Sequence, residues 1–137
     1  MDMTLRAIGL VRSPLLDPAT APRFETESTQ SADLVLDPAY VPGLKGLAVD
    51  QEIFVFTWLH LASRDTLEVH PRGNPELPMR GVFATRSPSR PNPIGLHRAR
   101  ISAINGNVLT VAAMEAVNGT PVIDIKPAEG NQPPRHA

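Results

Sequence analysis

The chain of 137 residues contains no cysteine. This absence excludes disulfide bonds, thiolate zinc sites, cysteine-ligated iron–sulfur clusters and a thiol nucleophile. It is typical of a protein kept in a reducing compartment, so we expect a cytoplasmic protein. His60, His70 and His97 lack the spacing of metal ligands, and we therefore expect no metal site.

Long helices and long apolar runs are missing as well. The 15 prolines are spread from Pro14 to Pro134 and, with nine glycines, they interrupt any long helix. No stretch approaches the roughly 20 apolar residues of a membrane span, and the N-terminus lacks the apolar core of a signal peptide. We expect one soluble domain over residues 1–128, followed by a flexible tail over residues 129–137.

Short strand-forming segments recur along the chain. Ile101–Ile104 and Val108–Val111 flank Asn105-Gly106, a pair that favours a type I′ turn, so we predict a hairpin there. The apolar run Ile53–Leu59 predicts a buried strand. Further strands are expected at Leu5–Val11, Asp33–Leu36, Thr66–His70, Met79–Thr85 and Pro121–Ile125, with a turn or single helical turn at Pro42–Val49. About seven short strands favour an all-β fold, a small barrel with long loops.

Carboxylates are absent from Leu77 through Met114, a segment that holds five arginines and no lysine. The segment therefore carries +5 and the remainder −6, which together give the net charge of −1. The planar guanidinium suits phosphates, carboxylates and stacked bases better than the ammonium of lysine. We expect an anionic ligand in this region.

The run ATRSPSRPNPIGLHRA, Ala84 to Ala99, lies inside this segment. Its three prolines forbid a helix and stiffen a loop that carries Arg86 and Arg90 as long donors. Gly95 removes a side chain where a backbone or a ligand would approach closely. The pattern indicates a preorganised binding loop. The alternative interpretation is a tight surface loop whose arginines are simply solvated.

The string GVFATRSPSRPNPIGL, Gly81 to Leu96, resembles the signature of the TsaA-like family, which includes the S-adenosylmethionine-dependent tRNA methyltransferases O. Ile8–Pro14 and Gly119–Pro127 resemble the opening and closing segments of that family, and FVFTWLH, ending at His60, resembles its apolar strand. The resemblance implies a single-sheet β-barrel of the class VIII methyltransferase type, a homodimer and an S-adenosylmethionine site without a Rossmann fold. The sequence has no glycine-rich dinucleotide fingerprint.

The resemblance also implies which residues surround the cofactor. Arg86 would bind its carboxylate, and the carboxylate of Glu115 would bind its ribose or offset its sulfonium charge. Three alternatives stay open: Glu115 as a strand end facing water, His60 as a structural histidine and Phe24 as a core residue. The implied cofactor residues are Arg23, Phe24, Glu25, His60, Leu61, Arg86, Leu96, Met114, Glu115 and Ala116.

By the same resemblance, the methyl acceptor is N6-threonylcarbamoyladenosine next to the anticodon of tRNA. Methyl transfer is an in-line displacement that needs alignment rather than a covalent residue. The threonyl carboxylate and the phosphates of tRNA suit arginine, and the expected substrate-binding residues are Arg90, Asn92, Arg98 and Arg100. Asp124 and Lys126 are expected to line the acceptor side as catalytic residues, with Asp124 as proton acceptor.

The chain ends soon after Pro127, whereas longer tRNA-methylating relatives carry a C-terminal domain, so we expect a minimal form of the family. Its segment Ser63–Pro78 is also shorter than theirs. These differences concern tRNA recognition more than cofactor binding. Two alternatives therefore stay open: a barrel that methylates a small molecule, and a non-catalytic module that binds the cofactor or RNA.

Overall fold

The computed structural model describes residues 1–16 and 31–128. The expected tail and the segment with Arg23, Phe24 and Glu25 lie outside these ranges. The strands are β1 (Gly9–Arg12), β2 (Ser31–Leu36), β3 (Glu52–Trp58), β4 (Glu68–Val69), β5 (Arg80–Gly81), β6 (Ile94–Asn105), β7 (Val108–Ala112) and β8 (Pro121–Pro127). Within these described ranges, three short 3-10 helices lie between the strands: η3 (Pro38–Leu44), η4 (Pro71–Gly73) and η5 (Val82–Ala84).

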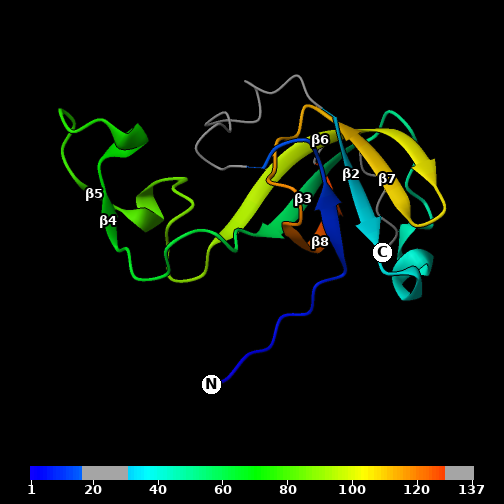
Figure 1. The fold of residues 1–137 in the computed structure, drawn as a ribbon, viewed down its shortest axis with the longest axis horizontal. Coiled ribbons are helices and arrows are strands. Elements are labelled where there is room, and N and C mark those ends of the chain that lie inside the picture. The colour runs from blue at the N-terminus through cyan, green and yellow to red at the C-terminus, as the bar shows by residue number, and fades with distance from the viewer. Residues whose placement is uncertain (17–30, 129–137) are drawn as a thin grey trace, which may run out of the picture.

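Six strands pair in a ring in the order β1-β2-β7-β6-β3-β8, and every pair is antiparallel (Figure 1). A short ladder, with Gly9 opposite Val122 and Leu10 opposite Pro121, joins the last strand to the first. The predicted all-β barrel is confirmed.

The interior of this barrel is aliphatic. Along β3, Ile53, Val55 and Thr57 are fully buried, whereas the residues between them point outward and are half-buried. This alternation is the period of two expected for a strand with one face on the core. Each large aliphatic side chain buried here contributes about 1.5–3 kcal/mol. No aromatic residue is among the buried residues of the described chain.

The predicted hairpin is confirmed, since Asn105 lies opposite Val108. Its two-residue loop, however, is Gly106-Asn107 and not Asn105-Gly106. Gly106 has a φ of 58° while Asn107 has no positive φ, so the turn is not of the predicted type I′, which needs a positive φ at both central residues. Strand β6, however, begins at Ile94 and not at Ile101. The last three residues of the signature, Ile94–Leu96, are therefore strand rather than loop. Pro93 is the last proline of the run, and from Ile94 onward the residues alternate between outward and inward positions opposite β3.

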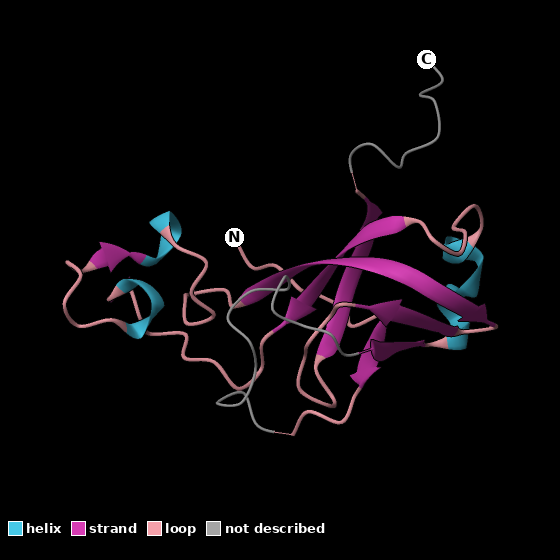
Figure 2. Ribbon diagram, turned by 90° about the horizontal axis from the view of Figure 1, so that it is seen from above, coloured by secondary structure: helices cyan, strands magenta, loops and turns pink. Residues whose placement is uncertain are grey.

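Strands β4 and β5 belong to an arm, residues 59–93, that projects from the barrel in both views (Figures 1 and 2). Both ends of the arm are tied together where it leaves the barrel. The amide of Leu59 donates to the carbonyl of Pro93 (2.8 Å), and the amide of Arg90 donates to the carbonyl of Ser63 (3.0 Å). The arm thus starts and ends at one fixed place, where β3 stops and β6 starts.

The antiparallel ring brings three connections to the same end of the barrel. These are the connection between β1 and β2, the arm between β3 and β6, and residues 113–120 between β7 and β8. The hairpin and the η3 connection lie at the other end. We call the end of the barrel that carries the first three connections the arm end. The segments expected to bind the cofactor belong to strands that start or stop there.

Gly95 of β6 lies opposite Thr57 of β3, at a place where neighbouring side chains leave no room for another. A Cβ at this position would overlap the hydroxyl of Thr57 and lie 2.9 Å from Nε2 of His97. The side chains of Thr57 and His97 are hydrogen-bonded to one another at 2.8 Å.

We therefore expect Gly95→Ala to lower the free energy of unfolding by roughly 1–3 kcal/mol, because the added methyl group forces this pair apart. The measurement is urea unfolding followed by circular dichroism. Gly43→Ala is the matched control, since a Cβ at Gly43 would meet nothing within 4 Å. Equal unfolding midpoints for the two variants would contradict the prediction.

Candidate functional site

The signature loop is held by hydrogen bonds within itself. The amide of Ser87 donates to the hydroxyl of Thr85 (3.2 Å), and the amide of Ser89 donates to the hydroxyl of Ser87 (3.2 Å). The guanidinium of Arg90 donates to the carbonyls of Thr85 (3.2 Å) and Ser87 (2.9 Å). Arg90, which was expected to bind substrate, therefore uses Nη1 to hydrogen-bond to the backbone of its own loop.

A pocket of about 380 Å³ lies beside this loop, within the range typical of ligand sites. Arg86 is exposed, and in the described chain its only hydrogen bond is a long one to the carbonyl of Leu96 (3.3 Å). Most of its donor fork therefore stays available to an anion. Phe83, with 79% of its surface exposed, adds an aromatic face that the sequence did not single out. The pocket is lined by Phe83, Thr85, Arg86, Arg90, Pro91, Asn92 and Ile94.

Arg64, which the sequence also did not single out, braces this pocket from the start of the arm. Its Nε donates to the carbonyl of Pro91 (2.8 Å), and its Nη2 donates to Oδ1 of Asn92 (3.2 Å). Its guanidinium lies 5.1 Å from the ring centre of Trp58. Asn92, expected to bind substrate, is exposed at the pocket and already holds one arginine there.

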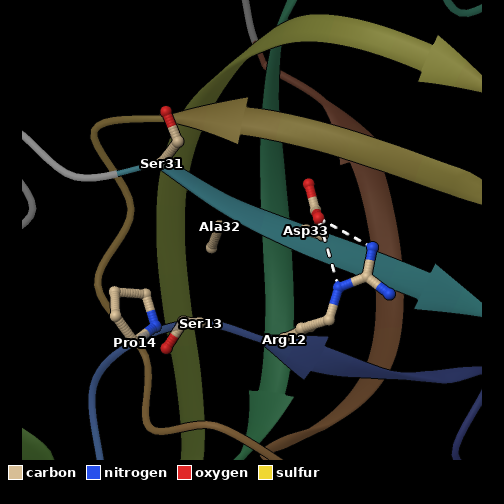
Figure 3. Close-up of a pocket in the computed structure, with 6 residues that line it drawn as sticks. All are labelled: Arg12, Ser13, Pro14, Ser31, Ala32 and Asp33. Atoms are coloured by element: carbon tan, nitrogen blue, oxygen red, sulfur yellow. Dashed lines mark hydrogen bonds and ion pairs between the residues drawn. The ribbon is translucent and has the colours of Figure 1, made fainter.

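A second pocket, of about 310 Å³, lies where β1 stops and β2 starts (Figure 3). Nη2 of Arg12 donates to Oδ2 of Asp33 (2.8 Å), and the hydroxyl of Thr110 donates to Oδ1 (2.7 Å). These hydrogen bonds, that of Arg12 first, lower the pKa of Asp33. Both carboxylate oxygens of Asp33 therefore accept hydrogen bonds that link β2 to its neighbours β1 and β7. The lining residues are Arg12, Ser13, Pro14, Ser31, Ala32 and Asp33.

Residues 113–118 are fastened to the end of β1. The hydroxyl of Ser13 donates to the carbonyl of Ala116 (2.5 Å), and its amide donates to Oδ1 of Asn118 (3.1 Å). Met114 and Ala116, both expected at the cofactor, are only 1% and 6% exposed and pack in the core. Glu115 between them is half-buried. Of this trio, Glu115 alone presents a polar side chain at the arm end.

The remaining expected cofactor residues lie on the surface. His60 and Leu61 follow β3 directly and are both exposed. The side chain of Leu96 points outward from β6, opposite Phe56 of β3, and is 36% exposed. The structure thus brings His60, Leu61 and Arg86 to the arm, while Leu96 lies on the outer wall of the barrel.

Arg98 and Arg100 share one carboxylate, that of Glu52 on the neighbouring strand. Nε of Arg98 donates to Oε2 (3.0 Å) and Nη2 of Arg100 donates to Oε1 (2.9 Å). These contacts, that of Arg98 first, lower the pKa of Glu52. The sequence did not single out Glu52, because the pairing depends on the register of Glu52 with Arg100. Part of the local +5 charge is therefore neutralised across the strands.

Asp124 and Lys126 lie on the outer face of β8. Nζ of Lys126 is 3.7 Å from Oδ2 of Asp124, and both side chains are more than half exposed. They lie opposite Phe56 and Phe54 of β3, and they line neither of the two pockets. The expected catalytic pair is therefore close to Arg98, across β3, and separate from the signature pocket.

Within the described residues, no group of three or more histidine, aspartate or glutamate side chains is placed to hold a metal ion. No helix in residues 1–16 and 31–128 is long and apolar enough to cross a membrane.

The model of the tRNA-methyltransferase O N-terminal domain family matches residues 10–129. The chain belongs to this family. It is 42% identical over 127 residues to a probable S-adenosyl-L-methionine-binding protein of Methanothermobacter thermautotrophicus, covering 93% of this chain and 90% of the relative. It is 44% identical over 124 residues to an S-adenosyl-L-methionine-binding protein of Archaeoglobus fulgidus, covering 90% and 88%.

The fold is also similar to a crystal structure of TrmO from Pseudomonas aeruginosa, with a TM-score of 0.75 and 29% identity. The match covers 93% of this chain but only 56% of that protein. The predicted family and fold class are confirmed. At the level of the family, so are the expected enzyme class, an S-adenosylmethionine-dependent methyltransferase, and its cofactor.

The lowered pKa of Asp33 predicts a pH dependence of stability. A carboxylate with a folded-state pKa below its unfolded value stabilises the fold above the unfolded pKa, about 3.9, and this contribution is lost as the pH falls through the folded pKa. We expect Asp33→Asn to be less stable than the parent at neutral pH and to lose less stability on acidification.

Urea midpoints measured from pH 7 down to about pH 3 test this expectation. Glu68→Gln, at an exposed position of β4, is the control. If the acid branch of Asp33→Asn ran parallel to that of the parent, the pair of Arg12 and Asp33 would carry no such stabilisation.

Proposed function

We propose that the protein transfers a methyl group from S-adenosylmethionine to N6-threonylcarbamoyladenosine next to the anticodon of tRNA, acting as a cytoplasmic homodimer. The observation that carries this proposal is the signature pocket: within the segment matched by the family, a self-braced loop presents the available donor fork of Arg86 beside the exposed ring of Phe83. Such a site suits a ligand with one carboxylate and one aromatic base.

The residues that would hold the cofactor come from the segments of the arm end. Arg86 binds the carboxylate of the methionine portion, and Glu115 binds the ribose or faces the sulfonium. Met114 and Ala116 shape the site through backbone, because their side chains are in the core. The full proposed set is Arg23, Phe24, Glu25, His60, Leu61, Arg86, Leu96, Met114, Glu115 and Ala116.

 Leu96 belongs to this set through its carbonyl, which accepts a hydrogen bond from Arg86 (3.3 Å).

The cofactor, when bound, supplies an activated methyl group on a sulfonium. In the transfer, the bond from the methyl carbon to sulfur breaks as the bond to the acceptor nitrogen forms, and that nitrogen gives up a proton. The protein has to align the acceptor with the methyl group and to receive the proton. We propose Asp124 as the proton acceptor, with Lys126 beside it as its charge partner.

The proposed acceptor-binding residues take two kinds of role. Asn92 borders the pocket, and Arg90 positions the loop through its bonds to the carbonyls of Thr85 and Ser87. Arg98 and Arg100 together keep one net positive charge after their pairing with Glu52, which suits contacts to phosphate.

The same neutralisation by Glu52 favours a second candidate, the methylation of a small molecule, because it reduces the cationic surface available to a large RNA. The dependence of acceptor binding on salt concentration distinguishes the two candidates. Binding held by phosphate contacts weakens as salt rises, by a log–log slope of about −0.7 per contact for single strands. Binding of a small acceptor in the pocket is far less sensitive. A module that binds the cofactor without catalysis would show no methyl transfer to either acceptor.

We expect the protein to bind S-adenosylmethionine and Arg86→Ala to weaken this binding at least tenfold, since hydrogen bonds to a charged group contribute about 1.5–3 kcal/mol. Isothermal titration calorimetry of both proteins measures the effect. Arg80→Ala is the matched control, because Arg80 is an exposed arginine of β5 in the same acid-free segment. An affinity unchanged in Arg86→Ala would remove its proposed role. No binding to the folded parent would overturn the proposed function.

Asp124→Ala is expected to abolish most methyl transfer while leaving cofactor affinity unchanged, because Asp124 lines neither pocket. The assay follows transfer of labelled methyl groups to tRNA that carries the threonylcarbamoyl group, with tRNA lacking this group as the control substrate. Full turnover by Asp124→Ala would exclude Asp124 as the proton acceptor.

A further inference from the structure

The outer face of β3 carries three aromatic side chains in a row, Phe54, Phe56 and Trp58, which we call the aromatic row. All three are half-buried, and they are half of the six aromatic residues of the chain. The buried core of the described residues is aliphatic. The outward residues of β1, β2 and β7 include no aromatic side chain. The rings are therefore gathered on one wall of the barrel.

Cations flank the aromatic row along its length. The guanidinium of Arg98 lies 5.5 Å from the ring centre of Phe54, and that of Arg64 lies 5.1 Å from the ring centre of Trp58. Lys126 lies opposite Phe54 on β8, and Arg100 lies one outward position further along β6. Two carboxylates, Glu52 and Asp124, accompany these four cations, so the wall keeps a net charge of +2.

The row also leads to the signature pocket. Trp58 is the last residue of β3 and lies opposite Ile94, which lines the pocket. Arg64, above the ring of Trp58, donates to Asn92 at the pocket's edge. A chain of nucleotides that followed the row would therefore reach the pocket directly after the last ring.

We propose that the aromatic row binds unpaired nucleotides of the RNA substrate by stacking. This inference rests on the proposed methylation of tRNA and adds the surface that receives its single-stranded loop. Every base has a face that stacks on an aromatic ring, and cations nearby bind the backbone. Successive outward residues of a strand are about 6.8 Å apart, so separate bases can lie along the row. One base stacks on the ring of Phe56, and others stack on the guanidinium groups that lie over Phe54 and Trp58. Paired bases are stacked within the helix and do not offer such faces.

A second copy of the chain fits this face less well. A two-fold interface places the same patch of each copy against the other. Two walls of net charge +2 would then face each other, and like charges brought together in an interface weaken it. The polyanionic backbone of RNA, in contrast, complements this charge.

The test measures fluorescence anisotropy of a short labelled single-stranded oligoribonucleotide, with a duplex of the same sequence as comparison. Phe54→Leu and Phe56→Leu keep an apolar side chain but remove the ring, and each is expected to weaken binding roughly tenfold. Phe56→Tyr keeps the ring and is expected to bind like the parent. Leu10→Ala, at a half-exposed outward position of β1, is the matched control with unchanged affinity.

Calorimetry with S-adenosylmethionine, run on the same variants, separates this inference from the proposed function. We expect cofactor affinity to be unchanged in Phe54→Leu and Phe56→Leu, which also shows that both are folded. Single-strand affinity equal to that of the parent in both variants would overturn the inference, as would a parent that binds no RNA at low salt. A shift from dimer to monomer in the variants, with RNA affinity retained, would instead make this wall an interface between copies.

Discussion

The pairing of β3 with β6 is the interaction on which the site depends. The two strands run antiparallel from Glu52 opposite Arg100 to Trp58 opposite Ile94. At its end, the hydrogen bond between the amide of Leu59 and the carbonyl of Pro93 fixes where the arm departs. The signature enters the barrel at this place, so the ladder positions the pocket. The absence of a side chain at Gly95 leaves room for the hydrogen-bonded side chains of Thr57 and His97.

The same ladder gives the barrel wall two different faces. Inward, β3 contributes Ile53 and Val55 to the aliphatic core, which holds the ring of strands together. Outward, it presents the aromatic row, with Arg98 on one side and Lys126 on the other. Because neighbouring residues of a strand point to opposite faces, stability and the proposed RNA contact use separate side chains. Changes on the outer face should therefore alter binding more than folding.

Local patterns account for what the sequence predicted of this structure. The hairpin and the buried strand after Gln51 follow from a turn-forming glycine and a run of apolar residues, and both are present, although the loop of the hairpin is Gly106-Asn107. The signature loop was recognisable from its residues alone. The start of β6 at Ile94 was not, because prolines precede it and arginines occupy its outward positions. The burial of Met114 could not be predicted from local patterns either, because the core residues around it come from several strands that only the closed barrel brings together.

The pairing of the arginines shows most clearly why the location of the anion-binding residue could not be predicted from the sequence. Five arginines in a segment without acids suggest a broad basic surface. In the folded chain, Arg98 and Arg100 pair with Glu52 from another strand, and Arg90 turns into the backbone of its own loop. Arg86 is left beside a pocket with most of its donors available. Beside the signature pocket, the capacity to bind a small anion therefore rests mainly on Arg86, and the net charge of the segment could not have identified this residue.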